Sequence, residues 1–384
     1  MYDLLLKSGL VIDPANDIHE VRDVAVKNGK VAIVEKNITH TESRTVVPVH
    51  GRLVTPGLID VHCHLGNGSR PVNADPDLIG IHSGVTLLCD GGTTGAANFN
   101  YFRGLAAGKA KTDLVCFLNL AVNGMVKDPE ITGDGDIDIE ATKNVIEANR
   151  DVIKGIKLRA VTGLSENIGI IAIETAKKLA TEVNLPLMLH IGEPRTRVEN
   201  DALDCYSRES VGLLEKGDII SHFMRMSSGG LVLEDGTVYP ELIAARKRGV
   251  VLDSCHGMGN FSFAAAEIAI RNGLVPDVIS TDMGYASQPI VQSLLVTMSK
   301  VLNMGLTIDQ VVAMTTINPA NAIGEDTRFG SLTPGSMANV LVMENVEGDY
   351  LFSDGYGGGR LQGTQLLEPR LILKNGISIP CLSR

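Results

Sequence analysis

The fold is decided by the stretch Gly57-Leu58-Ile59-Asp60-Val61-His62-Cys63-His64, an apolar run that ends in two histidines. Such a run is typical of a buried strand, in which side chains alternate between the two faces. His62 and His64 therefore share one face, and Cys63 takes the other. Two imidazoles on one face at a strand end can bind one metal ion, although a plain pair of core histidines would give the same pattern.

The composition is that of an ordinary soluble globular protein. The chain has 384 residues, of which 44% are apolar and 21% charged, enough for one large domain and a smaller one. It contains no apolar run of the ~20 residues that span a bilayer and begins without the features of a secretory signal. The net charge is −11 without a basic stripe, so we expect neither a membrane nor nucleic acid as a partner.

The six cysteines are scattered and form no C-x-x-C pair. Several lie inside apolar runs, where a free thiol acts as a small hydrophobe. We interpret them as reduced thiols, which points to a cytoplasmic location.

Two kinds of segment divide the chain. Both ends contain short runs rich in Val, Ile and Thr between turn signals, which predict β structure. In the middle, eight apolar strands alternate with helical stretches, as in a (β/α)8 barrel. We predict a TIM-like barrel over residues 56–324 beside a small β-sandwich domain formed by residues 1–55 plus 325–384. Strands are expected near 57–62, 84–90, 113–121, 153–160, 186–191, 218–223, 250–255 and 278–282, and helices at 168–183, 201–216, 239–248, 263–272, 289–304 and 307–316.

Three more candidate ligands each end a predicted strand. His190 follows Leu187-Met188-Leu189, His222 follows Ile219-Ile220-Ser221, and Asp282 follows Val278–Thr281. A single histidine at a strand end is more often a hydrogen-bonded core residue. Barrel enzymes, however, place their chemistry at the carboxyl ends of the strands. Nitrogen and oxygen ligands of this kind suit zinc best among the divalent ions.

The fourth predicted strand carries charged residues inside a barrel. Along Ile153–Arg159, Gly155, Lys157 and Arg159 share one face, whereas Ile156 and Leu158 face the helical layer. A lysine inside a barrel is costly unless it is paired or chemically changed. An internal salt bridge to an acidic residue is the plain alternative.

These motifs resemble the amidohydrolase superfamily over nearly the whole chain. One departure is Asn339, where the family usually has aspartate, far from the chemistry. The segments that carry the resemblance, in family order, are Tyr2–Lys7, Val11–Pro14, Pro56–His64, Gly155–Lys157, His190, His222, Asp282, Asn318–Ala320 and Gly335–Asn339.

The chain is most similar to the binuclear branch, whose barrel lysine is carboxylated by carbon dioxide and bridges two metals. The resemblance implies two divalent ions, with zinc the best fit, and a carbamate on Lys157. Lys154, with the wrong parity, is the alternative bridge. The implied ligands are His62, His64 and Asp282 for the first ion and His190 and His222 for the second.

The implied reaction is hydrolysis of an amide or ester bond of a small, anionic acylated substrate. In this scheme a metal-bridged hydroxide attacks the carbonyl carbon, because bound metal lowers the pKa of water towards ~7. Asp282 is then the catalytic residue, first as general base and then as general acid.

Two further stretches, Thr86–Ala96 and Ser254–Phe263, resemble the deacetylase or dihydroorotase-like group, which hydrolyses small acylated carboxylic acids. His256 would lie near the mouth of the site, where it contacts substrate or is structural. Arg159 would pair with a substrate carboxylate or with an acidic residue of the barrel. Dihydroorotases usually have an arginine where this chain has Gly66, which disfavours that activity.

Two rival functions follow from the same residues. A mononuclear deaminase on this barrel would lack the bridging lysine, so Lys157 argues against it. A non-catalytic scaffold would have lost ligands, whereas every ligand position is filled here. Family habit suggests a homo-oligomer, and the substrate itself cannot be read from loop residues.

Overall fold

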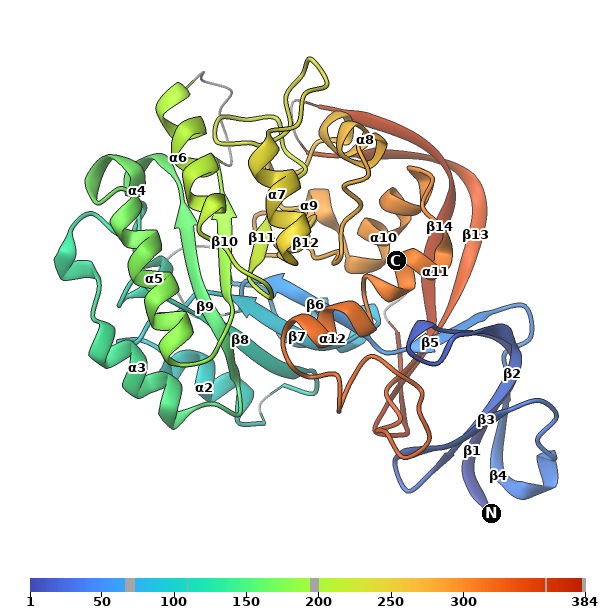
Figure 1. Ribbon diagram of the computed structural model, residues 1–384. Helices are drawn as coiled ribbons and strands as arrows, with labels where there is room; N and C mark the ends of the chain where they lie inside the picture. Colours follow the sequence, from blue (N-terminus) through green and yellow to red (C-terminus); the bar gives the residue numbers. More distant parts are fainter. Residues whose placement is uncertain (66–72, 109, 194–199, 356–357, 382–384) are drawn as a thin grey trace.

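The computed structural model describes residues 1–65, 73–108, 110–193, 200–355 and 358–381 (Figure 1). Gly66, at the position where dihydroorotases usually have an arginine, lies outside these residues. A parallel sheet of seven strands curls through the centre, in the order β12-β11-β10-β9-β8-β7-β6. The seven strands predicted up to residue 255 are confirmed as β6 (Leu58–Cys63), β7 (Val85–Gly91), β8 (Asp113–Asn119), β9 (Ile153–Ala160), β10 (Leu187–Ile191), β11 (Ile219–Ser221) and β12 (Val251–Asp253).

The eighth position of the barrel is filled by residues 278–283, which form no regular strand. Val278 makes an isolated parallel bridge to Asp253, and Met283 makes one to Cys63. Between them, the amide of Asp282 donates to the carbonyl of His62 over 2.7 Å. Asp282 itself has a φ of +51°, which breaks the extended backbone that a continuous ladder needs. The segment therefore closes the ring through backbone hydrogen bonds to both neighbouring strands, without a regular ladder on either side.

Helices cover the outside of the curled sheet (Figure 1). Several begin at side-chain caps, such as Asn200, Ser262 and Ser293, which accept backbone N–H groups of the first turn. The predicted helix over 289–304 is broken at Gln292, whose φ is +67°. No described helix is long and apolar enough to cross a membrane. The helices are α1 (Pro76–Ile79), α2 (Asn100–Ala106), α3 (Ile139–Ala148), α4 (Thr162–Asn167), α5 (Ile170–Glu182), α6 (Asp201–Gly212), α7 (Pro240–Arg248), α8 (Phe263–Arg271), α9 (Gln288–Val291), α10 (Leu294–Asn303), α11 (Ile308–Ala313) and α12 (Ile317–Ala322).

Both chain ends join in a second, mixed sheet, as predicted. Its order is β15-β14-β13-β5-β1-β2-β3, with β4 paired to β1. It has its own buried apolar cluster, which includes Leu6, Val24 and Val340. We keep residues 1–55 plus 325–384 and 56–324 as the proposed division into domains. The strands are β1 (Tyr2–Asp13), β2 (Ile18–Lys27), β3 (Lys30–Glu35), β4 (Ser43–Pro48), β5 (Leu53–Pro56), β13 (Val340–Ser353), β14 (Arg360–Lys374) and β15 (Ile377–Ile379).

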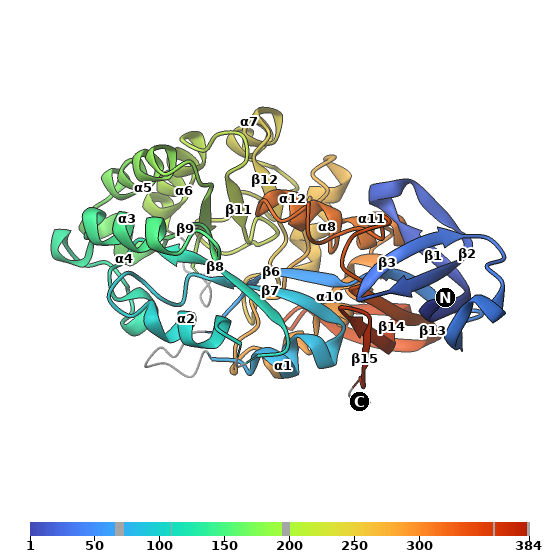
Figure 2. The ribbon, with the colours of Figure 1, turned by 90° about the horizontal axis from the view of Figure 1, so that it is seen from below.

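The mixed sheet lies beside the barrel rather than over its strand ends (Figure 2). Helix α10 links the two units, since the hydroxyl of Ser299 accepts the amide of Leu367 in β14 over 2.9 Å. The carboxyl ends of β6 to β12 therefore remain the place where side chains from distant parts of the sequence meet.

Candidate metal centre

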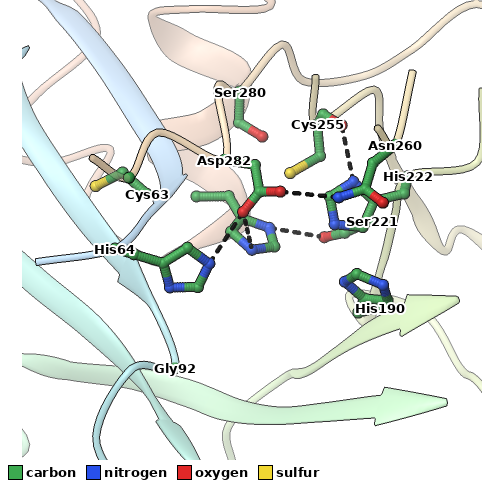
Figure 3. A network of polar contacts seen from close by, with 12 residues as sticks. Cys63, His64, Gly92, His190, Ser221, His222, Cys255, Asn260, Ser280 and Asp282 are labelled. Atoms are coloured by element: carbon green, nitrogen blue, oxygen red, sulfur yellow. Dashed lines mark hydrogen bonds and ion pairs between the residues drawn. The ribbon is translucent and has the colours of Figure 1, made fainter. Parts of the chain in front are cut away.

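The predicted histidines and Asp282 meet at the carboxyl ends of the strands (Figure 3). The ring centroid of His62 lies 5.6 Å from that of His64 and 5.4 Å from that of His222. The ring centroids of His190 and His222 are 4.2 Å apart. All four histidines are buried. Residues more than 200 positions apart in the sequence thus form one cluster of nitrogen and oxygen donors.

Asp282 lies at the centre of this cluster. Its Oδ1 is 2.9 Å from His64 Nε2 and 3.8 Å from His62 Nε2, and its Oδ2 accepts a hydrogen bond from the Asn260 amide over 2.9 Å. Burial acts to raise the pKa of Asp282, but the hydrogen bond from His64 and the neighbouring histidines together hold it well below its ordinary value. The carboxylate is therefore ionised and can act as a ligand or a base.

The partners of His222 fix which of its ring nitrogens is available. Its Nδ1 lies 2.8 Å from the carbonyl oxygen of Cys255, and because a carbonyl only accepts, Nδ1 carries the proton. The Nε2 atom is buried and has no hydrogen-bond partner among the described residues. A buried nitrogen lone pair without a partner is costly, and a metal ion would satisfy it.

His62 is oriented by a similar chain of contacts. Its Nδ1 lies 3.2 Å from the Ser221 hydroxyl, which donates to Asp253 over 3.0 Å. Since the Ser221 proton is used, its oxygen accepts from Nδ1–H and leaves the Nε2 lone pair of His62 facing the cluster. Burial lowers the pKa of His62, and likewise that of His190 and His222. Neutral imidazole is the form that binds metals.

Lys157 reaches the cluster from β9. Its side chain is buried, and its Nζ lies 3.0 Å from Nε2 of His62. No carboxylate lies within ion-pair distance of it among the described residues, so the predicted salt-bridge alternative is absent there. Burial lowers the pKa of Lys157 to about 8, against the raising effect of nearby acidic groups. Lys154 points elsewhere and pairs with Glu325 at 2.6 Å.

Two glycines at the end of β7 permit this close packing. A Cβ on Gly91 would lie 2.2 Å from the His62 ring, and one on Gly92 would lie 2.5 Å from the Lys157 side chain. Gly92 also has a φ of +91°, which favours glycine. Both belong to the Thr86–Ala96 stretch singled out in the sequence, but their contacts depend on the tertiary fold.

One group of donors that could hold a metal ion differs from the predicted ligand sets. His62, His222, Cys255 and Asp282 each offer one atom, and these atoms all lie within 4.8 Å of one another. The group mixes members of both predicted sets and adds Cys255, which was not among the ligands expected from the sequence. The donor set fits a divalent ion such as zinc, because it combines neutral imidazoles, a carboxylate and a sulfur.

His256 does not face an open site. It is fully buried, its Nδ1 lies 2.7 Å from the carbonyl oxygen of Gly257, and its Nε2 lies 2.8 Å from Nζ of Lys300. Its ring also stacks on Phe261, with centroids 4.8 Å apart. With both nitrogens engaged by the protein, the structural interpretation of His256 is favoured over the predicted contact with substrate.

Arg159 has an acidic partner within the barrel. Its guanidinium forms an ion pair with Glu130 and lies 3.7 Å from Asp128. Burial acts to lower the pKa of Arg159, but the Glu130 carboxylate outweighs this effect and raises the pKa above its ordinary value. The side chain therefore stays charged. The barrel-acid alternative is therefore present, and a contact between Arg159 and substrate stays a prediction.

The residues that sequence reasoning missed are the ones that hold the donors in place. Ser221 and Asp253 orient His62, Asn260 holds Asp282, and Glu130 holds Arg159. Ser221 and Asp253 each end a strand, at the same edge as the predicted ligands. That position was the one available signal in the sequence.

Comparisons with known proteins agree with this geometry. Residues 53–355 match the model of the amidohydrolase family. A deacetylase of Brucella anthropi is 32% identical over 90% of this chain and 84% of its own, and a deacetylase of Agrobacterium fabrum is 32% identical over 89% and 83%.

Solved structures show the same barrel. A crystal structure of an adenine deaminase aligns with a TM-score of 0.89 at 28% identity, covering 99% of this chain and 100% of that one. A dihydroorotase aligns with a TM-score of 0.85 at 29% identity, covering 98% and 99%. The barrel, the cluster of histidines at its strand ends and the match over 53–355 lead to one conclusion: this chain belongs to the amidohydrolase family.

Proposed function

We propose that the protein is a metal-dependent hydrolase that cleaves an amide or ester bond of a small, anionic acylated substrate. The observation that carries the proposal is the cluster of four buried histidines, buried Lys157 and half-buried Asp282, with Nε2 of His222 left without a described partner. The named deacetylases among its relatives support the acylated substrate. A cytoplasmic homo-oligomer remains our expectation.

The ligands that we propose are those expected from the sequence. Lys157, as a carbamate, would lie between two ions, and zinc is the best candidate for both. Bound ions would supply an activated water and polarise the substrate carbonyl. The proposed ligands are His62, His64 and Asp282 for the first ion and His190 and His222 for the second.

The chain's own contribution to proton transfer is Asp282. Its carboxylate is ionised and is held by His64 and Asn260, so it can accept a proton from the attacking water. Once protonated, it can deliver that proton to the leaving nitrogen or oxygen. Burial of the cluster excludes bulk water, which strengthens these electrostatic interactions.

Hydrolysis of a cyclic amide is the second candidate, favoured by the likeness to the dihydroorotase structure. Deamination is the third, because the adenine deaminase structure aligns over the full chain. The buried position of Lys157 beside His62 supports a bridged centre rather than a mononuclear deaminase.

Metal analysis combined with a substrate panel tests the proposal. Zinc, manganese, iron and cobalt are measured per chain in wild type, Lys157→Ala and the matched control Lys154→Ala, which removes a lysine of the same strand that pairs outside the cluster. We expect about two ions in wild type and Lys154→Ala and a clear loss in Lys157→Ala.

The same proteins are assayed with N-acyl and O-acyl acids, dihydroorotate and adenine. Turnover of the acylated acids supports the proposal, and turnover of dihydroorotate or adenine alone replaces it by the second or third candidate. About one ion per chain, unchanged by Lys157→Ala, would contradict the bridged centre.

A further inference from the structure

Cys255 differs from the other buried cysteines in what surrounds it. Cys63, Cys89 and Cys116 all belong to buried apolar clusters, as expected for a thiol that acts as a small hydrophobe. Cys255 is fully buried but belongs to none of the apolar clusters of the described residues. A role in apolar packing therefore does not account for it.

The side chains around Cys255 carry atoms that can bind a metal ion. Its Sγ lies within 4.8 Å of ligand atoms of His62, His222 and Asp282, and Figure 3 shows the sulfur turned towards the Asp282 carboxylate. A sulfur, two imidazoles and a carboxylate are a donor set that zinc accepts.

The partner-free nitrogen of His222 is a second and independent sign of a ligand. His222 is fully buried, and its Nδ1 already donates to the carbonyl oxygen of Cys255. Its Nε2, the atom that remains, has no hydrogen-bond partner among the described residues. The backbone carbonyl of Cys255 thus orients the His222 ring, and Nε2 of that ring is free to bind an ion in the same cluster.

The backbone at this position is also unusual. Cys255, His222 and Asp282 have φ angles of +38°, +71° and +51°, a region that residues other than glycine rarely adopt. Such conformations cost free energy and persist where the surrounding structure enforces them. Three of the four donors in the group therefore lie on strained backbone, His222 and Cys255 just beyond the ends of β11 and β12 and Asp282 in the irregular segment that closes the ring.

We propose that Cys255 is an additional, sulfur ligand of the metal centre, through which the site selects zinc over manganese. The inference rests on the proposed function, since it needs a metal at this cluster. On binding, the sulfur–metal bond replaces the S–H bond and the thiol proton leaves to solvent. Soft thiolate favours zinc, whereas an all-nitrogen-and-oxygen site accommodates manganese as well.

Cobalt substitution tests the sulfur bond directly and independently of turnover. Metal-free wild type, Cys255→Ser and Cys63→Ala are titrated with Co²⁺ and followed by absorption. Cys63 is the matched control. It is a buried thiol that lies between His62 and His64 in the sequence, but its Sγ contacts the carbonyl oxygen of Cys89. We expect a sulfur-to-cobalt charge-transfer band in wild type and Cys63→Ala and none in Cys255→Ser.

Competition between Zn²⁺ and Mn²⁺ gives a second readout. Cys255→Ser should weaken zinc binding at least about tenfold, because even an outer partner of a metal ligand is worth about 10- to 100-fold in affinity. Its manganese affinity should change much less.

The outcomes separate this inference from the proposed function. Stoichiometric cobalt binding without the band in wild type, or a band that persists in Cys255→Ser, overturns the sulfur ligand and leaves the metallohydrolase standing. Failure of wild type to bind any of these ions overturns both. Because the wild-type spectrum alone can refute the sulfur ligand, the test does not depend on the variant folding.

Discussion

Replacing Lys300 with methionine removes a buried charge that contacts His256. The Lys300 side chain in α10 is buried, with Nζ 2.8 Å from Nε2 of His256 and 3.2 Å from the carbonyl oxygen of Ile290. Burial lowers the pKa of Lys300 from 10.5 to about 7, against the raising effect of Asp354. Methionine has a similar length and no charge, so it fills the space without that cost.

The magnitude follows from the pKa. A fall from 10.5 to about 7 corresponds to about 5 kcal/mol when Lys300 is fully protonated, at ~1.36 kcal/mol for each tenfold change in proton affinity. At pH 7, where the folded form is half protonated, about 4 kcal/mol of this destabilisation is present, and at pH 10 about 1 kcal/mol remains. The cost of leaving Nε2 of His256 unpaired, about 1–3 kcal/mol, is the same at both pH values.

The sign can be worked out from proton binding. Between pH 7 and 10.5 the unfolded chain holds a proton on Lys300 that the folded protein has lost, so the Lys300 contribution to wild-type stability rises with pH. The variant lacks this dependence. Relative to wild type, Lys300→Met should therefore be about 1–3 kcal/mol more stable at pH 7 and lose about 3 kcal/mol of that relative stability by pH 10.

Urea unfolding at the two pH values measures the difference. Because the chain has no tryptophan, far-ultraviolet circular dichroism is the appropriate signal. Lys143→Met is the control, since the Lys143 side chain is 41% exposed and its ion pair with Glu182 spans 3.6 Å. A difference between Lys300→Met and wild type that stays the same from pH 7 to pH 10 would refute the reasoning.

Three further predictions concern the site. Asp282→Asn should abolish turnover while keeping most of the bound metal, and retained kcat would exclude its role as base. Gly91→Ala should displace His62, because the new Cβ would lie 2.2 Å from the ring. The metal content per chain, measured by elemental analysis, should therefore fall. Gly104→Ala, in open space, should leave it unchanged. Ser221→Ala removes the acceptor of the His62 ring N–H and should weaken metal affinity about 10- to 100-fold in a chelator competition; unchanged affinity would show that the contact is dispensable.

Local periodicity made much of the barrel predictable. Alternation along a strand placed Lys157 inside and Leu158 outside, and the apolar runs located the seven regular strands. The same reasoning could not foresee the break at Gln292 or the irregular segment 278–283, because both depend on backbone conformations enforced by contacts with other elements.

The partners of the site residues were beyond the reach of the sequence. His256 is engaged by Lys300, 44 positions away, and Arg159 by Glu130, 29 positions away. The two members of each pair lie in different elements or loops, so the periodicity within one element does not relate them. Only packing of the elements decided that these side chains meet.

By itself, the sequence determined the order of the strands along the chain and the residues at their carboxyl ends, since these depend on patterns within single elements. The order of the motifs along the chain carried the family resemblance. Tertiary structure decided which donor atoms come within 4.8 Å of one another. It placed Cys255 among these donors and buried His256. The physical reason is that a metal site is a property of distances across the barrel. The sequence fixes which side chains each strand carries, whereas closure of the ring fixes where those side chains converge.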